Sequence, residues 1–144
     1  METNAIDLLT YELYHTLSFR NSKPPKLAEV RKFFYEGGIL INNTFDEPIA
    51  FTTASYLKAL ESQIAIGNLK QFLQREISSK TDVFGKIAQR TSVYEYSFAE
   101  IPPRKMPRGI NYMQFVKDGD TWRVSSMAWN DENENHRIPA ELVA

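Results

Sequence analysis

Few side chains in this sequence could carry acid–base, nucleophilic or metal chemistry. The chain has no cysteine and two histidines, His15 and His136, so it offers no thiolate nucleophile and no zinc–thiolate site. His15 falls opposite the apolar face of its predicted helix and His136 falls in the C-terminal tail, which argues against catalysis by either. No histidine–carboxylate cluster has metal-ligand spacing, and there is no glycine-rich phosphate loop. The sequence therefore predicts no metal and no cofactor.

Arg90 is a charged side chain among aromatic neighbours. In the predicted strand 84–100, alternation gives one face these residues: Ala88, Arg90, Ser92, Tyr94, Tyr96 and Phe98. On a concave face, Arg90 would anchor a ligand carboxylate or phosphate. On a convex face it would be a solvated arginine, and a salt bridge with Glu76 or Glu95 is the third alternative. Strand parity alone does not decide between these.

The composition is that of a small domain with balanced charge. The 144 residues include 17 Lys and Arg against 18 Asp and Glu, a net charge of -1, which gives no electrostatic drive towards nucleic acid. The loop 102–108 is basic and could recruit an anionic partner, although a solvated loop fits the charge balance better. The N-terminus lacks a signal-peptide pattern, and no apolar run approaches the ~20 residues of a membrane span. We expect a cytoplasmic protein without nucleic-acid or membrane partners.

Helical periodicity appears in three segments of the first half of the chain. Residues 5–19 place apolar side chains at steps of three and four, with Tyr14 at the edge of that face. Tyr14 is therefore either a hydrogen-bond donor in a pocket or a tyrosine with its hydroxyl in water. A second helix is predicted from about Lys26 to Tyr35, ended by Gly37-Gly38, and a third from Thr52 or Thr53 to Ile66.

Strand patterns dominate the second half. The clearest is a hairpin over 109–130, in which Asp118-Gly119 lies between two segments rich in aromatic and β-branched residues. Four further strands are predicted at 39–45, 49–51, 69–81 and 84–100, the last two joined by a turn near Asp82–Gly85. Asp46 follows the first strand, where turn chemistry explains it better than a role at a pocket mouth.

The order of these elements defines the fold class. Because helices and strands are largely segregated along the chain, we predict an α+β fold with a largely antiparallel sheet. Three N-terminal helices would pack on this strongly curved sheet and leave a conical pocket, a favourable place for a ligand. The whole chain, 1–144, is expected to form one domain, with an irregular tail over 131–144.

Three stretches follow the pattern of a known superfamily. Leu27–Ile41 passes from a short helix with paired aromatics into a strand, Tyr56–Asn68 fits a third helix, and Trp122–Met127 is a Trp-Arg-aliphatic run after a glycine turn. Over residues 5–131, the chain resembles the nuclear transport factor 2-like superfamily of cystatin-like fold, which includes SnoaL-like and ketosteroid isomerase-like proteins. The resemblance implies a curved sheet, a conical pocket and frequent dimerisation through the outer sheet face. It does not imply one reaction.

The resemblance also places candidate pocket residues. In the isomerase branch a helix-1 tyrosine and a protonated aspartate donate to the enolate oxygen, and a second aspartate moves the proton. Tyr14 matches the tyrosine, but Asn42 stands at the proton-shuttling position and Asn111 at the other. An amide cannot take up a proton near neutral pH. Steroid-isomerase chemistry in its usual form is therefore not expected.

Two functions follow as expectations. The first is a SnoaL-like protein that binds a small, partly hydrophobic molecule. Any reaction it catalyses would be of the isomerase or lyase type, and its catalytic residues are unknown. Its pocket would be lined by Tyr14, Asn42, Arg90, Asn111 and Trp129. The alternative is a non-catalytic homodimeric interaction module, in which Trp129 would lie in the dimer contact. A homodimer is expected under either function.

Overall fold

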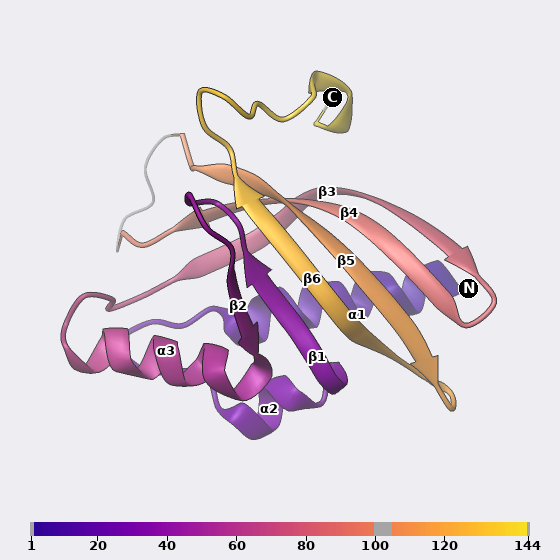
Figure 1. Ribbon diagram of the computed structural model, residues 1–144, viewed down its shortest axis with the longest axis horizontal. Helices are drawn as coiled ribbons and strands as arrows, with labels where there is room; N and C mark the ends of the chain where they lie inside the picture. The colour runs from indigo at the N-terminus through magenta and orange to yellow at the C-terminus, as the bar shows by residue number, and fades with distance from the viewer. Residues whose placement is uncertain (1, 100–104, 144) are drawn as a thin grey trace.

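The structure, a computed structural model, describes residues 2–99 and 105–143 (Figure 1). Its helices are α1 (Glu2–Leu17), α2 (Leu27–Arg31) and α3 (Thr53–Ala65), with a short 3₁₀ helix at Ala140–Leu142. They accompany one curved sheet, so the α+β class is confirmed. Residues 100–104, which include the start of the predicted basic loop, lie outside the described part of the chain.

The sheet has six strands and is mixed. They are β1 (Phe34–Asn42), β2 (Ile49–Thr52), β3 (Leu73–Phe84), β4 (Ile87–Ser97), β5 (Arg108–Asp118) and β6 (Thr121–Asp131). The spatial order is β2-β1-β6-β5-β4-β3. Neighbouring strands in this order are antiparallel except β1 and β6, which are parallel.

The predicted hairpin is present as β5 and β6. Its turn lies between Asp118 and Thr121, and Gly119 adopts a φ of 62°, the left-handed conformation that glycine tolerates best. Trp122, expected in the core, is 5% exposed. The β3–β4 turn lies at Gly85 and Lys86, slightly later than the sequence pattern suggested.

The second predicted helix was too long. It ends at Arg31, and Phe34 already belongs to β1, because the backbone of this segment pairs with β6. The Val124 amide donates to the Phe33 carbonyl at 2.8 Å, and Phe34 lies opposite Val124 in the parallel ladder. Gly37, expected to stop the helix, instead has a φ of 82° within β1, where the register with β6 shifts between Phe34 and Ile39.

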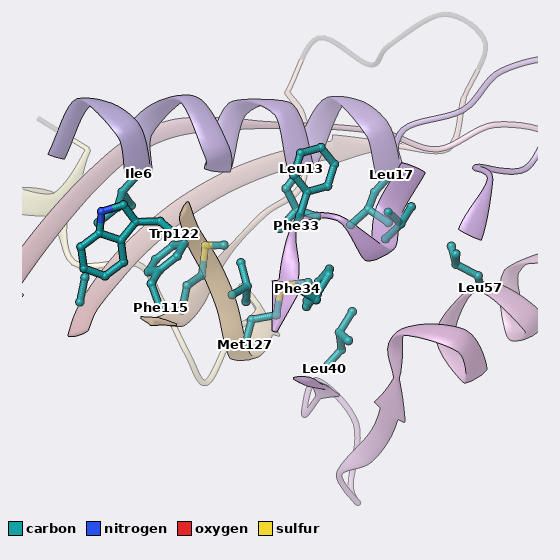
Figure 2. Packing of buried hydrophobic residues seen from close by; sticks show 14 residues of the cluster. Ile6, Leu13, Leu17, Phe33, Phe34, Leu40, Leu57, Phe115, Trp122 and Met127 are labelled. Carbon is teal, nitrogen blue, oxygen red and sulfur yellow. The ribbon is translucent and has the colours of Figure 1, made fainter. Parts of the chain in front are cut away.

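The core lies between α1 and the concave face of the sheet. Ile6, Leu13 and Leu17 of α1 are buried, and Figure 2 shows them over Phe115, Trp122 and Met127 of β5 and β6. Because these apolar positions are seven and four residues apart, close to whole turns of a helix, one face of α1 is buried along its length. The helix therefore covers the middle of the concave face.

The third helix packs at the other end of the sheet. Figure 1 shows α3 beside β1 and β2, away from α1. It starts at a capping box, in which Thr52 Oγ1 accepts from the Ser55 amide at 3.1 Å and Ser55 Oγ accepts from the Thr52 amide at 2.9 Å. Among the described helices, none is long and apolar enough to cross a membrane.

Candidate functional site

The inward-facing residues of β4 lead from a closed region into an open one. Arg90, Ser92, Tyr94 and Tyr96 alternate along the strand and therefore share one face, the concave one. Contacts from α1 reach the first two of these residues: Asp7 meets Arg90, and Tyr14 meets Ser92. The helix ends at Leu17, so the last two residues lie beyond its cover.

Under α1, Tyr14 belongs to a buried hydrogen-bond chain. Its hydroxyl lies 2.7 Å from Ser92 Oγ, and Asn111 Nδ2 donates to the same hydroxyl at 3.2 Å. Ser92 Oγ in turn donates to Glu76 Oε2 at 2.5 Å. Because Ser92 gives its hydrogen to Glu76, the Tyr14 hydroxyl donates to Ser92, and the chain runs in one direction from Asn111 to Glu76.

This chain leaves Tyr14 no hydrogen for a ligand. Burial, the largest influence, raises the pKa of Tyr14 to about 12, so its hydroxyl stays protonated at neutral pH. Asn111 Oδ1 is buried without a hydrogen-bond partner among the described residues. The pair does meet in space, as the resemblance implies, but its polar atoms face one another and Ser92.

Arg90 completes the closed region. Its guanidinium binds Asp7 Oδ1 at 2.6 Å, Thr81 Oγ1 at 2.7 Å and Glu76 Oε2 at 3.0 Å. The Arg90 side chain is 2% exposed. The face carrying Arg90 is therefore concave, and the salt bridge with Glu76, one of the alternatives left open by the sequence, is present. We call Tyr14, Glu76, Arg90, Ser92 and Asn111 the closed network.

Beyond the end of α1 lies a cavity of about 230 Å³, open to solvent. It is bounded by α3, by β1 and β2, and by the far ends of β3, β4 and β6. Its lining residues are Asn42, Phe51, Tyr56, Ala59, Leu60, Gln63, Leu69, Phe72, Gln74, Tyr94, Tyr96, Phe98, Trp129 and Asp131. We call this cavity the aromatic pocket, because half of these residues are aromatic.

The aromatic rings form two groups. Tyr56 lies edge-on to Phe51, with ring centroids 5.4 Å apart, and to Trp129, at 6.0 Å. The second group lies around the end of β4. The ring centroid of Tyr96 in β4 lies 6.3 Å from that of Phe72, just before β3, and 5.6 Å from that of Phe98, just after β4. Such offset and edge-to-face contacts stabilise aromatic clusters. Aromatic rings therefore line the pocket both on the side of α3 and on the side of β4.

Asp131 is the polar end of the pocket. Its Oδ1 accepts from the Tyr94 hydroxyl at 2.6 Å and its Oδ2 from the Tyr96 hydroxyl at 2.9 Å. Burial, followed by the nearby Asp131 charge, raises the pKa of both tyrosines above the usual value. Both hydroxyls therefore remain neutral donors, and Asp131 holds the two rings in place.

A glycine on the intervening strand makes the Tyr94 contact geometrically feasible. Gly109 of β5 lies opposite Tyr94 of β4 and opposite Asp131 of β6, so the three residues form one row across the sheet. A Cβ at Gly109 would lie 2.3 Å from the Tyr94 hydroxyl. The Tyr94 side chain thus crosses over Gly109 to reach Asp131, a path that any larger residue would block.

The structure divides the five predicted pocket residues between the two regions. Asn42 and Trp129 line the aromatic pocket, while Tyr14, Arg90 and Asn111 lie in the closed network. His15 is exposed, and its ring stacks on that of Tyr11 with the ring centroids 6.1 Å apart. No metal-binding group of His, Asp and Glu occurs within residues 2–99 and 105–143.

Sequence reasoning missed Asp131, the carboxylate of the pocket. Residue 131 was assigned to the irregular tail, whereas it is the last residue of β6. The available signal was strand parity: Met127, Trp129 and Asp131 alternate along one face once the strand is extended by two residues. Tyr94 and Tyr96 were placed on the same strand face as Arg90, but whether that face was concave was left open and their partner was not recognised.

Solved structures with the same architecture come from several bacteria. A protein of unknown function with a cystatin-like fold from Nostoc punctiforme has a TM-score of 0.70 at 10% identity, covering 92% of each chain. An NTF2-like protein of unknown function from Pseudomonas putida has a TM-score of 0.67 at 8% identity, covering 96% of this chain and 95% of the other. The fold is that of the NTF2-like proteins.

A third similar structure has a different description. A candidate Ca/calmodulin-dependent kinase II association domain from Exiguobacterium sibiricum has a TM-score of 0.64 at 12% identity, covering 92% of this chain and 94% of the other. No family model matches the sequence, and no curated protein matches it. At sequence identities this low, similarity to the NTF2-like structures shows the fold alone. The function has to be argued from the side chains.

Proposed function

We propose that this protein binds a small, partly hydrophobic molecule in the aromatic pocket, at the wide end of a conical sheet. The observation that carries the proposal is the concentration of rings around one open cavity, which places Tyr56 and Trp129 opposite Tyr96 and Phe98. Ligand sites combine apolar walls with a few polar groups, and here Asn42, Gln74 and Asp131 supply the polar groups.

Proton-transfer chemistry in this pocket would have to use Asp131. Among its described lining residues, Asp131 is the one carboxylate, and none is a histidine, lysine or arginine. Asn42, at the place of the isomerase proton shuttle, is an amide whose Oδ1 accepts from the Thr44 amide at 3.1 Å. A reaction of the isomerase or lyase type would therefore differ from steroid isomerisation in the position of its base.

The proposal is tested by thermal shift with a panel of small ketones, lactones, alcohols, carboxylates and ammonium compounds. We expect at least one panel member to raise the melting temperature of the wild type, because a ligand that binds only the folded state stabilises it. Ala59→Phe, which fills the cavity, should abolish that shift. Ala65→Phe is the matched control, since Ala65 is exposed on the same helix. No stabilisation of the wild type by any compound would overturn the proposal.

A second candidate function is a non-catalytic homodimer formed through the outer sheet face. Tyr112 is 59% exposed, Ile87 58% and Ile39 46%, and strand alternation puts all three on the convex side. Exposed apolar residues on one sheet face favour an interface. One structural neighbour, described as an association domain, is a further reason to test self-association.

Sedimentation equilibrium distinguishes this second candidate. We expect a dimer at micromolar concentration and dissociation by Tyr112→Glu, because a carboxylate would be buried at the interface. Glu36→Gln, at an exposed position, is a control that should leave the mass unchanged. A wild-type monomer at these concentrations would contradict the dimer and leave ligand binding intact.

A further inference from the structure

The aromatic pocket contains an acidic side chain and no basic one. Among its described lining residues, Asp131 is the only one that carries a charge at neutral pH, and none is a lysine, arginine or histidine. The tyrosines do not change this balance, since burial raises the pKa of Tyr56 to about 12 and the pKa of Tyr94 and Tyr96 also lies above the usual value. The pocket therefore has a net negative charge.

The hydrogen-bond donors next to Asp131 are already bonded to its carboxylate. The Tyr94 and Tyr96 hydroxyls both donate to Asp131, which leaves oxygen lone pairs rather than hydrogens for a ligand. An anionic ligand would meet the carboxylate without a cationic partner, and burying an unpaired charge is costly. A cationic ligand would meet a carboxylate that can accept further hydrogen bonds or lie directly against the positive charge.

The aromatic rings favour the same sign of charge. Phe, Tyr and Trp rings have electron-rich faces that attract a cation within about 6 Å of the ring centroid, and the attraction increases when water is excluded. Rings from Tyr56 and Trp129 on one side and from Phe72, Tyr96 and Phe98 on the other surround the cavity. A ligand of alkylated ammonium type would place methyl or methylene groups against these rings and its charge towards Asp131.

The volume limits the ligand. The cavity of about 230 Å³ is smaller than the ~300–1,000 Å³ usual for drug-sized ligands. We infer that the aromatic pocket binds a small organic cation, a quaternary or substituted ammonium, held between the aromatic rings and the Asp131 carboxylate. This inference rests on the proposed function and specifies the chemical class of its ligand.

The decisive experiment is isothermal titration of the full chain with two probes of the same shape. Choline carries a quaternary nitrogen, and 3,3-dimethylbutan-1-ol replaces that nitrogen with carbon. We expect choline to bind at least about tenfold more tightly, because the shape and hydroxyl are shared and only the charge differs. Equal affinities, or tighter binding of the alcohol, would overturn the cation inference.

Two carboxylate variants locate the effect. Asp131→Asn keeps an oxygen acceptor for the tyrosines but removes the charge, so choline affinity should fall about tenfold while affinity for the alcohol changes less than twofold. Asp120→Asn, in the exposed turn at the opposite end of the β5–β6 hairpin, should change neither affinity. Unchanged choline affinity in Asp131→Asn, or an equal loss in Asp120→Asn, would contradict the inference.

A ring variant and a folding check complete the design. Phe98→Leu keeps an apolar side chain but removes an aromatic face, and it should weaken choline binding more than binding of the alcohol. Circular dichroism reports whether each variant is folded. Should Asp131→Asn fail to fold, the ratio of the two wild-type affinities, together with Phe98→Leu, still decides the inference.

The outcomes also separate this inference from the proposed function. If neutral compounds stabilise the wild type but choline does not bind at millimolar concentration, the cation inference fails and the proposed function stands. If neither choline nor any neutral compound binds, both fail. If choline binds and Ala59→Phe does not weaken it, the cation occupies another surface and the inference is wrong.

Discussion

The closed network and the aromatic pocket are built on the same strand. Arg90 and Ser92 of β4 point into the first, and Tyr94 and Tyr96, the next two inward positions, point into the second. Their surroundings differ because α1 ends at Leu17. Under the helix the side chains of the closed network are hydrogen-bonded to one another, with Asn111 Oδ1 as the exception, whereas beyond it the tyrosine rings face a cavity.

The difference shows that an inward-facing polar residue is not by itself a ligand contact. Tyr14 and Asn111 look like pocket residues in the sequence, but beneath the helix Asn111 donates to the Tyr14 hydroxyl, which is bonded to Ser92. Asp131 looks like a tail residue, but it lies beyond the end of α1 and lines the aromatic pocket. The element covering each position decides whether its polar atoms stabilise the fold or remain available to a ligand.

The largest effect is expected in the closed network. Arg90→Met removes the cation between Glu76 and Asp7 and leaves the Glu76 carboxylate, 18% exposed, without its main partner. We expect a loss of about 3 kcal/mol in the free energy of unfolding, measured in urea. Arg75→Met is the control, because Arg75 pairs with Glu95 while 73% exposed and should cost less than about 1 kcal/mol. Similar values for the two variants would mean that burial does not distinguish these ion pairs.

The next largest effect is expected at the boundary of the pocket. Gly109→Ala would place a Cβ 2.3 Å from the Tyr94 hydroxyl, so the ring must move and its bond to Asp131 must break. We expect about 2 kcal/mol of destabilisation together with loss of ligand affinity. In a Tyr94→Leu background the same substitution should cost clearly less, which a double-mutant cycle measures. An equal cost in both backgrounds would contradict the crossing of Tyr94 over Gly109.

A smaller effect separates stability from binding. Tyr14→Phe removes the hydroxyl between Asn111 and Ser92, so we expect about 1–2 kcal/mol of destabilisation. Ligand affinity of the aromatic pocket should change less than twofold, because Tyr14 does not contact that cavity. Tyr11→Phe, at a residue 67% exposed, should change neither quantity. A large loss of affinity in Tyr14→Phe would show that the two regions act as one site.

The smallest effect at physiological pH concerns the buried tyrosines. The pKa of Tyr14 and of Tyr56 is raised to about 12 by burial, against ~10 in an unfolded chain. The folded state therefore holds these protons more tightly, and the resulting stability is fully present below about pH 10 and is lost as the pH rises towards 12. Thermal melts across this range, with absorbance at 295 nm for tyrosinate, test the prediction. Complete tyrosinate formation by pH 11 in a still-folded protein would contradict it.

Much of the fold could be predicted because its signals are local. The Asp118-Gly119 turn and the alternation of its flanking residues indicate β5 and β6 directly, and the capping residues before Ala54 mark the start of α3. The end of α2 could not be predicted in the same way. Phe34 joins β1 because it pairs with Val124, and that pairing overrides the local helical pattern.

The site was less predictable for a related reason. Asn42 and Trp129 line a cavity, whereas Arg90, predicted as a pocket residue with a salt bridge to Glu76 or Glu95 as the alternative, is bound to Glu76. The sequence pattern gives the face of each residue but not the length of sheet that α1 covers. That length separates Ser92 from Tyr94 and could be read only from the packing of the helix.

The parallel pairing between β1 and β6 has a consequence for the order of folding. It brings together pocket residues that are distant in sequence: Phe51 and Tyr56 come from the first half of the chain, and Trp129 and Asp131 from the last strand. Contacts between segments so distant in sequence form late, because the entropy of closing the loop must be overcome first. During synthesis, the pocket would be the last part of the molecule to assemble. A ligand that occupies it would select chains whose final strand has docked.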